Sequence, residues 1–247
     1  MKRHLLLLLT SLSVVLYNVQ AQEHNPELVA KEVKLLTQAY IQAQRLSFDV
    51  RYYYANETAP AVYLDSLSGN CKISGSHYWY ELDSTEMLYN DQCVIILYKE
   101  DKLMYLAKPS AQLRATNPLA LLDSFLLTNN KLLYGLEIKG KEKIITIDFG
   151  KDGPCKRLQY YIDVSTGWLT KMVNVVKADQ LYDPSVRAQV ETGNTYAIVE
   201  TRFSNYRQNS FDDTVFNTAR YFTKDGDKYV ATASYAMYQI FLSNPGL

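Results

Sequence analysis

The segment from Asn70 to Ala107 constrains the fold more than any other part of this sequence. Apolar, β-branched and aromatic residues occur there in short runs. The turn-forming residues that interrupt these runs are Ser74–Ser76, Asp83–Thr85, Asn90–Gln92 and Lys99–Asp101. Short apolar runs separated by such residues are typical of strands joined by tight turns. The segment therefore predicts an antiparallel meander, around which the rest of the chain is built.

The first 21 residues carry the features of a secretory signal peptide. Lys2 and Arg3 form a positive start, Leu5–Leu16 form an apolar stretch, and Val19-Gln20-Ala21 has small residues where a signal peptidase cleaves. An uncleaved anchor is the alternative, but the apolar stretch is short for a membrane span. We expect cleavage after Ala21, so that residues 22–247 form one exported, periplasmic domain with no membrane-spanning segment.

Charge and composition exclude some classes of partner. Removing Lys2 and Arg3 from the 26 basic residues leaves 24, against 26 acidic ones. A chain without a basic excess gives no indication of binding to nucleic acid or to an anionic membrane surface. The sequence also has 21 tyrosines, whose high strand propensity and polar end suit a half-exposed sheet.

The three cysteines, Cys71, Cys93 and Cys155, leave at least one thiol unpaired within the chain. A disulfide between Cys71 and Cys93 depends on strand register. If the chain folds back at Ser84 without interruption, the two are too far apart to bond. If Ser74–His77 instead loop out of the ladder, they meet, and the sequence leaves both arrangements open. The cysteine spacing matches no zinc-binding pattern.

A helix is predicted at Asn25-Pro26-Glu27, where a capping side chain, a proline and an acid follow one another. The apolar residues spaced three or four apart after this start are Val29, Val33, Leu36, Tyr40 and Ala43. They give one apolar stripe, so we expect this helix to pack across a sheet.

Further strands are expected on both sides of the meander. In 47–54, Phe48, Val50, Tyr52 and Tyr54 alternate with Asp49, Arg51 and Tyr53, which predicts a strand with an apolar and a polar face. The other expected strands are 61–67, 131–139, 143–149, 158–164, 168–177, 188–190 and 195–205, with a tight turn at Ser165-Thr166-Gly167.

Two more elements complete the expected fold. Asn117-Pro118 begins a second helix, which runs to Leu127 and is apolar nearly all round. The tail predicts a hairpin at Asp225-Gly226-Asp227, followed by either a strand or a short helix over 234–241. The sequence thus predicts one mainly β domain with α elements, of about ten or eleven sequential antiparallel strands with one concave face.

Catalytic motifs are scarce. His77 is the one histidine expected inside the fold, since His4 leaves with the signal and His24 lies at the new terminus. The sequence has no Gly-x-Ser-x-Gly elbow and no metalloprotease, EF-hand, P-loop or dinucleotide-binding motif. We therefore predict a non-enzymatic protein with no catalytic residues, cofactor or metal. A hydrolase that uses His77 or a carboxylate pair is the least supported alternative.

The chain resembles the periplasmic lipoprotein carrier LolA and its relatives, over most of 26–205. The resemblance is carried by an aromatic strand Tyr78-Trp79-Tyr80-Glu81-Leu82, by 87–98 with Asp91 at its turn and Tyr98 as its last aromatic, and by Asn117-Pro118-Leu119-Ala120-Leu121-Leu122. It implies an unclosed antiparallel β half-barrel with an N-terminal helix and a helical lid. The sequence departs from the family at Ser74-Gly75-Ser76, where no lid-locking arginine is present, and at Gln92-Cys93.

The resemblance also implies a ligand site in the concave face. Its expected residues are Tyr78, Tyr80, Leu82, Ile95, Leu97 and Tyr105 from the strands and Leu121, Leu122 and Phe125 from the lid. The function it implies is a non-enzymatic carrier of a lipid or acylated lipoprotein. The alternative is a protein-interaction subunit of an envelope or secretion assembly, with the same fold and a filled core.

Overall fold

Two long strands form the middle of one large sheet. The computed structural model describes residues 25–110, 132–150, 153, 155–181, 196–226 and 228–243. β1 (Arg45–Asn56) pairs antiparallel with β2 (Tyr63–Ser74) on one side and with β11 (Tyr196–Gln208) on the other. The predicted signal peptide, second helix and 188–190 strand lie outside the described residues.

The meander continues from β2 as predicted. Its strands are β3 (His77–Leu82), β4 (Thr85–Tyr89), β5 (Val94–Tyr98) and β6 (Leu103–Ala107), each antiparallel to the one before. All four predicted turns fall between these strands, so the turn-forming residues located them correctly. Asp83 has a positive φ of 46° in the β3–β4 turn, a conformation that Asp tolerates better than most residues.

A second meander forms the other half of the sheet. It consists of β7 (Leu133–Lys139), β8 (Glu142–Asp148), β9 (Arg157–Asp163) and β10 (Leu169–Lys177), followed by a 3-10 helix, η1 (Ala178–Leu181). The carboxylate of Asp163 accepts hydrogen bonds from the backbone N–H groups of Ser165 and Thr166 and so shapes the predicted β9–β10 turn. β10 then pairs with β11, which returns the chain to β1.

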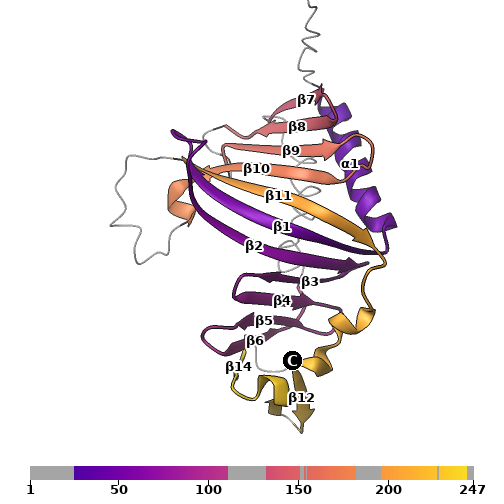
Figure 1. Cartoon of the computed structure of the whole chain (residues 1–247), viewed down its shortest axis with the longest axis vertical. Coiled ribbons are helices and arrows are strands. Elements are labelled where there is room, and N and C mark those ends of the chain that lie inside the picture. The colour runs from indigo at the N-terminus through magenta and orange to yellow at the C-terminus, as the bar shows by residue number, and fades with distance from the viewer. Residues whose placement is uncertain are drawn as a thin grey trace, which may run out of the picture.

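The sheet is open, with β7 at one edge and β14 (Gln239–Leu242) at the other. Figure 1 shows the twelve strands in the order β14-β6-β5-β4-β3-β2-β1-β11-β10-β9-β8-β7. The expected unclosed antiparallel sheet with an N-terminal helix is confirmed. The sheet exceeds the expected ten or eleven strands partly because the tail supplies β14, which pairs parallel with β6.

The helix α1 (Pro26–Gln42) packs on one face of this sheet, which we call the helix face (Figure 1). The Asn25 side chain caps it by accepting from the N–H groups of Glu27 and Leu28. All five residues of the predicted stripe are buried. The Tyr40 hydroxyl lies 2.6 Å from that of Tyr206, which donates to the Leu169 carbonyl at 2.9 Å, so hydrogen bonds as well as apolar contacts join the helix to the sheet.

The tail, residues 211–243, covers part of the opposite face, which we call the tail face. It contains η3 (Asp213–Phe216), η4 (Thr218–Arg220), the hairpin β12 (Phe222–Asp225) and β13 (Lys228–Ala231), and η5 (Ala233–Tyr235) before β14. The predicted hairpin is confirmed, and 234–241 proves to be a 3-10 turn followed by a strand. Apolar tail residues, among them Val215, Phe216 and Tyr221, bury Trp79, Leu88, Ile95, Leu97, Met104 and Leu106 of the meander.

The three cysteines are all free and buried. Cys71 pairs with Tyr80 across β2 and β3, and it belongs to the helix-face core, whereas Cys93 lies in the core under the tail. The register that would join them is therefore not the one adopted, because Ser74–His77 turn between two strands and do not loop out of one. Burial raises the pKa of Cys71 to about 12 and that of Cys93 to about 11, so both remain thiols at neutral pH.

Candidate functional site

The helix face of the meander carries a continuous apolar surface. Directly opposed residues of neighbouring strands share a face. The pairing places one residue from each of β3, β4, β5, β6 and β14 in a single row: Tyr80, Met87, Ile96, Tyr105 and Phe241. The rings of Tyr105 and Phe241 stack with centroids 5.2 Å apart. A second row, Tyr78, Tyr89, Val94 and Ala107, lies beside the first.

A cavity of about 450 Å³ opens over this surface at β5 and β6. Its apolar and aromatic walls are Val94, Ile96, Tyr98, Leu103, Tyr105 and Ala107, and its polar members are Asp101 and Ser243. Small-molecule sites are typically about 300–1,000 Å³ in volume, mostly apolar, with a few polar groups that orient the ligand. This apolar cavity therefore has the size and the lining of a site for one hydrophobic chain.

The structure brings together four of the six strand residues that sequence analysis proposed. Tyr78, Tyr80, Leu82 and Tyr105 lie on the helix face, and Tyr105 lines the apolar cavity. Burial raises the pKa of Tyr80, so its hydroxyl is neutral at physiological pH. The lid residues Leu121, Leu122 and Phe125 lie outside the described residues.

Ile95 and Leu97 were placed on the wrong face. The β5–β6 register pairs Ile96 with Tyr105, and it pairs Ile95 and Leu97 with Leu106 and Met104. Ile95 and Leu97 are therefore on the tail face, where the tail buries them. The residues that line the cavity from β5 are Val94, Ile96 and Tyr98, which sequence analysis did not propose.

A buried carboxylate on the tail face joins the meander to the tail. Glu86 is 6% exposed, and its Oε1 accepts from Trp79 Nε1 at 2.8 Å and from the Tyr221 hydroxyl at 2.7 Å. Its Oε2 lies 3.2 Å from Lys99 Nζ. Burial, and then the charge of Glu86, raise the pKa of Tyr221, so this hydroxyl stays protonated and donates. The network therefore anchors the tail to β3 and β4 through one buried carboxylate.

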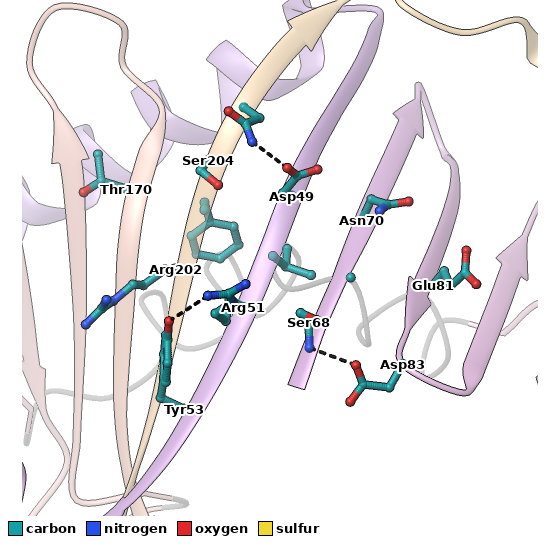
Figure 2. Close-up of a pocket in the computed structure, with 14 residues that line it drawn as sticks. Asp49, Arg51, Tyr53, Ser68, Asn70, Glu81, Asp83, Thr170, Arg202 and Ser204 are labelled. Atoms are coloured by element: carbon teal, nitrogen blue, oxygen red, sulfur yellow. Dashed lines mark hydrogen bonds between the residues drawn. The ribbon is translucent and has the colours of Figure 1, made fainter. Parts of the chain in front are cut away.

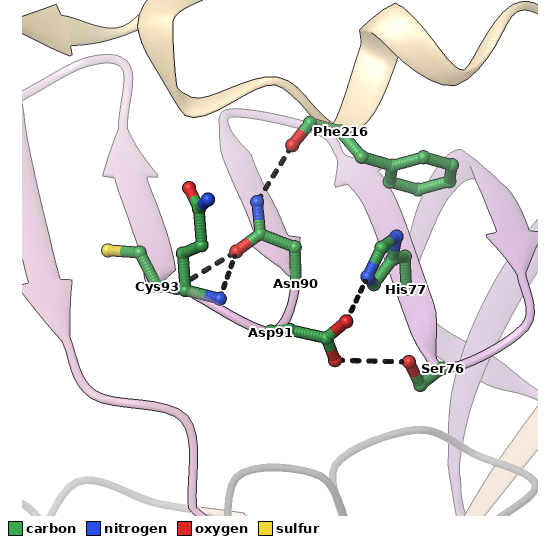
Figure 3. A network of polar contacts seen from close by, with 7 residues as sticks. Ser76, His77, Asn90, Asp91, Cys93 and Phe216 are labelled. Carbon is green, nitrogen blue, oxygen red and sulfur yellow. Dashed lines mark hydrogen bonds and ion pairs between the residues drawn. The ribbon is translucent and has the colours of Figure 1, made fainter.

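His77 takes part in a polar network but does not form a catalytic relay (Figure 3). Its Nε2 lies 2.9 Å from Asp91 Oδ2, and Ser76 Oγ donates to Asp91 Oδ1 at 3.2 Å. The acid therefore lies between the serine and the histidine, whereas nucleophilic catalysis needs the histidine between the other two. Beside it, Asn90 Nδ2 donates to the Phe216 carbonyl at 2.8 Å, which places this network at the base of the docked tail.

The described part of the chain contains no group of three or more His, Cys, Asp or Glu side chains arranged to hold a metal ion. None of the helices in the described ranges combines the length and the apolarity that a membrane span requires.

A second cavity, of about 730 Å³, lies on the tail face (Figure 2). It extends over β10, β11, β1, β2 and the end of β3, and its lining is mostly polar. The alternation over 47–54 had placed Asp49, Arg51 and Tyr53 on one polar face, and all three line this cavity. Sequence analysis assigned them no role, because an exposed polar strand face is ordinarily only solvated.

No protein-family model matches the sequence, and no curated protein matches it. Solved structures do align with most of the chain. An uncharacterised conserved protein from Thermus thermophilus aligns at 6% identity and a TM-score of 0.47, over 86% of this chain and 97% of that one. A LolA superfamily protein from Nitrosomonas europaea aligns at 7% and 0.35, over 77% and 98%.

The lipoprotein LppX from Mycobacterium tuberculosis aligns at 10% identity and a TM-score of 0.39, over 76% of this chain and 99% of that one. At such low identities and TM-scores, these alignments show only a similar arrangement of strands and helices. They assign no ligand and no activity to this chain.

Proposed function

We propose that this protein is a periplasmic, non-enzymatic binder and carrier of a lipid or acylated lipoprotein, which it holds in the apolar cavity on the helix face. The observation that carries this proposal is the position of the cavity over a row of apolar side chains that crosses five strands. Tyr78, Tyr80, Leu82 and Tyr105 would form the strand side of the site. An acyl chain would lie along the row, with its polar end toward Asp101 and Ser243.

Hydrophobic burial supplies enough free energy for such a ligand. Each buried methylene contributes about 0.8 kcal/mol, so a chain of about ten methylenes gains roughly 8 kcal/mol before ordering costs. That amount corresponds to a micromolar dissociation constant at best. A carrier needs this range of affinity, because it must release its ligand as well as hold it.

Ile96→Glu tests the site, because Ile96 lies in the wall of the cavity and is only half-buried. A carboxylate there must be desolvated when an apolar chain enters, so the affinity for a fluorescent long-chain fatty acid should fall about tenfold or more. Tyr80→Glu, in the same row, should act in the same direction.

The matched control is Val62→Glu, which adds the same charge at a side chain that is 60% exposed and outside the cavity. Circular dichroism would show that each variant is folded. Val62→Glu should bind the fatty acid as tightly as the wild type does. If Ile96→Glu also binds as tightly as the wild type, the ligand does not lie in this cavity.

A further inference from the structure

The polar cavity on the tail face is separate from the proposed lipid site, since the two lie on opposite faces of the sheet. Its lining carries charge of both signs. At one end, Arg202 of β11 is directly opposite Arg51 of β1. On its other side, Arg202 is directly opposite Lys171 of β10, which lies outside the lining. Like charges at directly opposed positions destabilise a sheet. These three basic residues therefore repel one another unless negatively charged groups lie nearby.

Within the described ranges, only the middle residue of the three has a carboxylate partner. Arg202 Nε lies 2.7 Å from Glu200 Oε1. Among the ion pairs of the described residues, none involves Arg51 or Lys171. Lys171 lies over the ring of Tyr161 instead, with Nζ 3.9 Å from the centroid. Arg51, which lines the cavity, is thus a cation without a carboxylate partner there.

Tyrosine contacts hold the two guanidinium groups in place (Figure 2). Arg202 Nη2 donates to the Tyr63 hydroxyl at 2.9 Å, and Arg202 Cζ lies 4.6 Å from the centroid of the Tyr53 ring. Arg51 Nη1 donates weakly to the Tyr53 hydroxyl, at 3.5 Å. Tyr53 therefore contacts both arginines, and both arginines line the cavity. Two oriented guanidinium groups are suited to a phosphate, which offers more acceptor oxygens than a carboxylate does.

The other end of the cavity is acidic. Ser68 of β2 is directly opposite Arg51, and Asp83 Oδ1 accepts from the Ser68 N–H at 3.1 Å. Asp49 lies elsewhere in the lining, two residues before Arg51 on β1, and its Oδ2 accepts from the neutral Asn205 Nδ2 at 2.6 Å. Neither Asp83 nor Asp49 forms an ion pair with a described basic residue, whereas Glu81 is paired with Lys99. Neighbouring strands of a sheet are about 4.8 Å apart. Over β11, β1, β2 and the β3–β4 turn, the cavity lining thus changes from positive at Arg202 and Arg51 to negative at Asp83.

We propose that this cavity binds a small zwitterionic ligand, with a phosphate against Arg51 and Arg202 and an ammonium group against Asp83. An anion alone would leave the carboxylates uncompensated and would be repelled by them. A cation alone would leave Arg51 uncompensated. A ligand with both charges satisfies both ends, and its source is either a soluble phosphoethanolamine-type molecule or the headgroup of a lipid.

Titration calorimetry on the full mature chain tests the proposal with phosphoethanolamine as the probe. The wild type should bind phosphoethanolamine about tenfold or more tightly than inorganic phosphate or ethanolamine, because each of these lacks one charged contact. Arg51→Gln and Asp83→Asn should each weaken binding by a similar factor, whereas Lys228→Gln, on the exposed β13, should not. Asp83→Asn keeps an acceptor for the Ser68 N–H and suits the positive φ, so the turn is retained.

Vesicles separate the two sources of the ligand. If the wild type co-sediments with phosphatidylcholine vesicles that contain phosphatidylethanolamine and Arg51→Gln does not, that result assigns the zwitterion to a lipid headgroup. Binding of free phosphoethanolamine without co-sedimentation assigns it to a soluble molecule. The proposal is overturned if neither probe binds, if phosphate binds as tightly as phosphoethanolamine, or if Arg51→Gln and Asp83→Asn bind like the wild type. Ile96→Glu should leave this binding unchanged, so failure here is distinguishable from failure of the lipid site.

Discussion

Replacing Tyr221 with alanine should lower the free energy of unfolding by about 3–5 kcal/mol, the range measured for removing a large buried aromatic side chain. Tyr221 is 0% exposed and lies among the tail-face core residues, with its ring 5.2 Å from that of Tyr235. Its loss opens a cavity in that core and also removes a hydrogen bond to the buried carboxylate of Glu86. Urea unfolding followed by tryptophan fluorescence measures the change, since Trp79 donates to the same carboxylate.

Tyr221→Phe separates the two contributions. It keeps the ring and removes only the hydroxyl, and Glu86 Oε1 still accepts from Trp79. It should therefore cost about 1.5–3 kcal/mol, the contribution of a hydrogen bond to a charged group. Hydrogen exchange over 211–243 should increase in the alanine variant more than in the phenylalanine variant, because the tail loses its apolar anchor. A loss below about 1 kcal/mol for Tyr221→Ala would mean that the tail contributes little to the fold.

Leu97→Ala should cost about 2–5 kcal/mol, since it truncates a leucine that is 0% exposed in the tail-face core. The same change should leave the affinity for a long-chain fatty acid within about twofold of the wild type, because Leu97 points away from the apolar cavity. The adjacent substitution Ile96→Ala is the matched comparison. It should weaken fatty-acid binding at a smaller cost in stability. Equal effects of the two substitutions on binding would contradict the assignment of the two faces.

Local sequence signals predicted the elements of this fold well. The cap at Asn25 and the stripe from Val29 to Ala43 located α1, because both depend only on neighbours along the chain. The turn residues within 74–101 located the four turns of the meander for the same reason. The strand count was less accurate, because β14 joins β6 from a distant part of the sequence.

The faces of β5 could not be predicted as well as its position. Val94-Ile95-Ile96-Leu97 is apolar without alternation, so periodicity does not say which residues face which side. The β5–β6 turn pairs Ile96 with Tyr105, and only this register shows that Ile95 and Tyr105 lie on different faces. The unbroken apolar run was itself a signal that both faces are covered, as they are in buried strands. The tail covers one of them.

The central claim is that the helix-face cavity holds an acyl chain, and its most direct test is the ligand content of the native protein. The protein would be purified from its native cells without detergent, extracted with organic solvent and analysed by mass spectrometry, with Ile96→Glu treated in parallel. We predict a reproducible acylated species at close to one per protein in the wild type and its loss in Ile96→Glu. A folded wild-type protein that is free of lipid and has a stoichiometric protein partner would contradict the claim and indicate an interaction subunit instead.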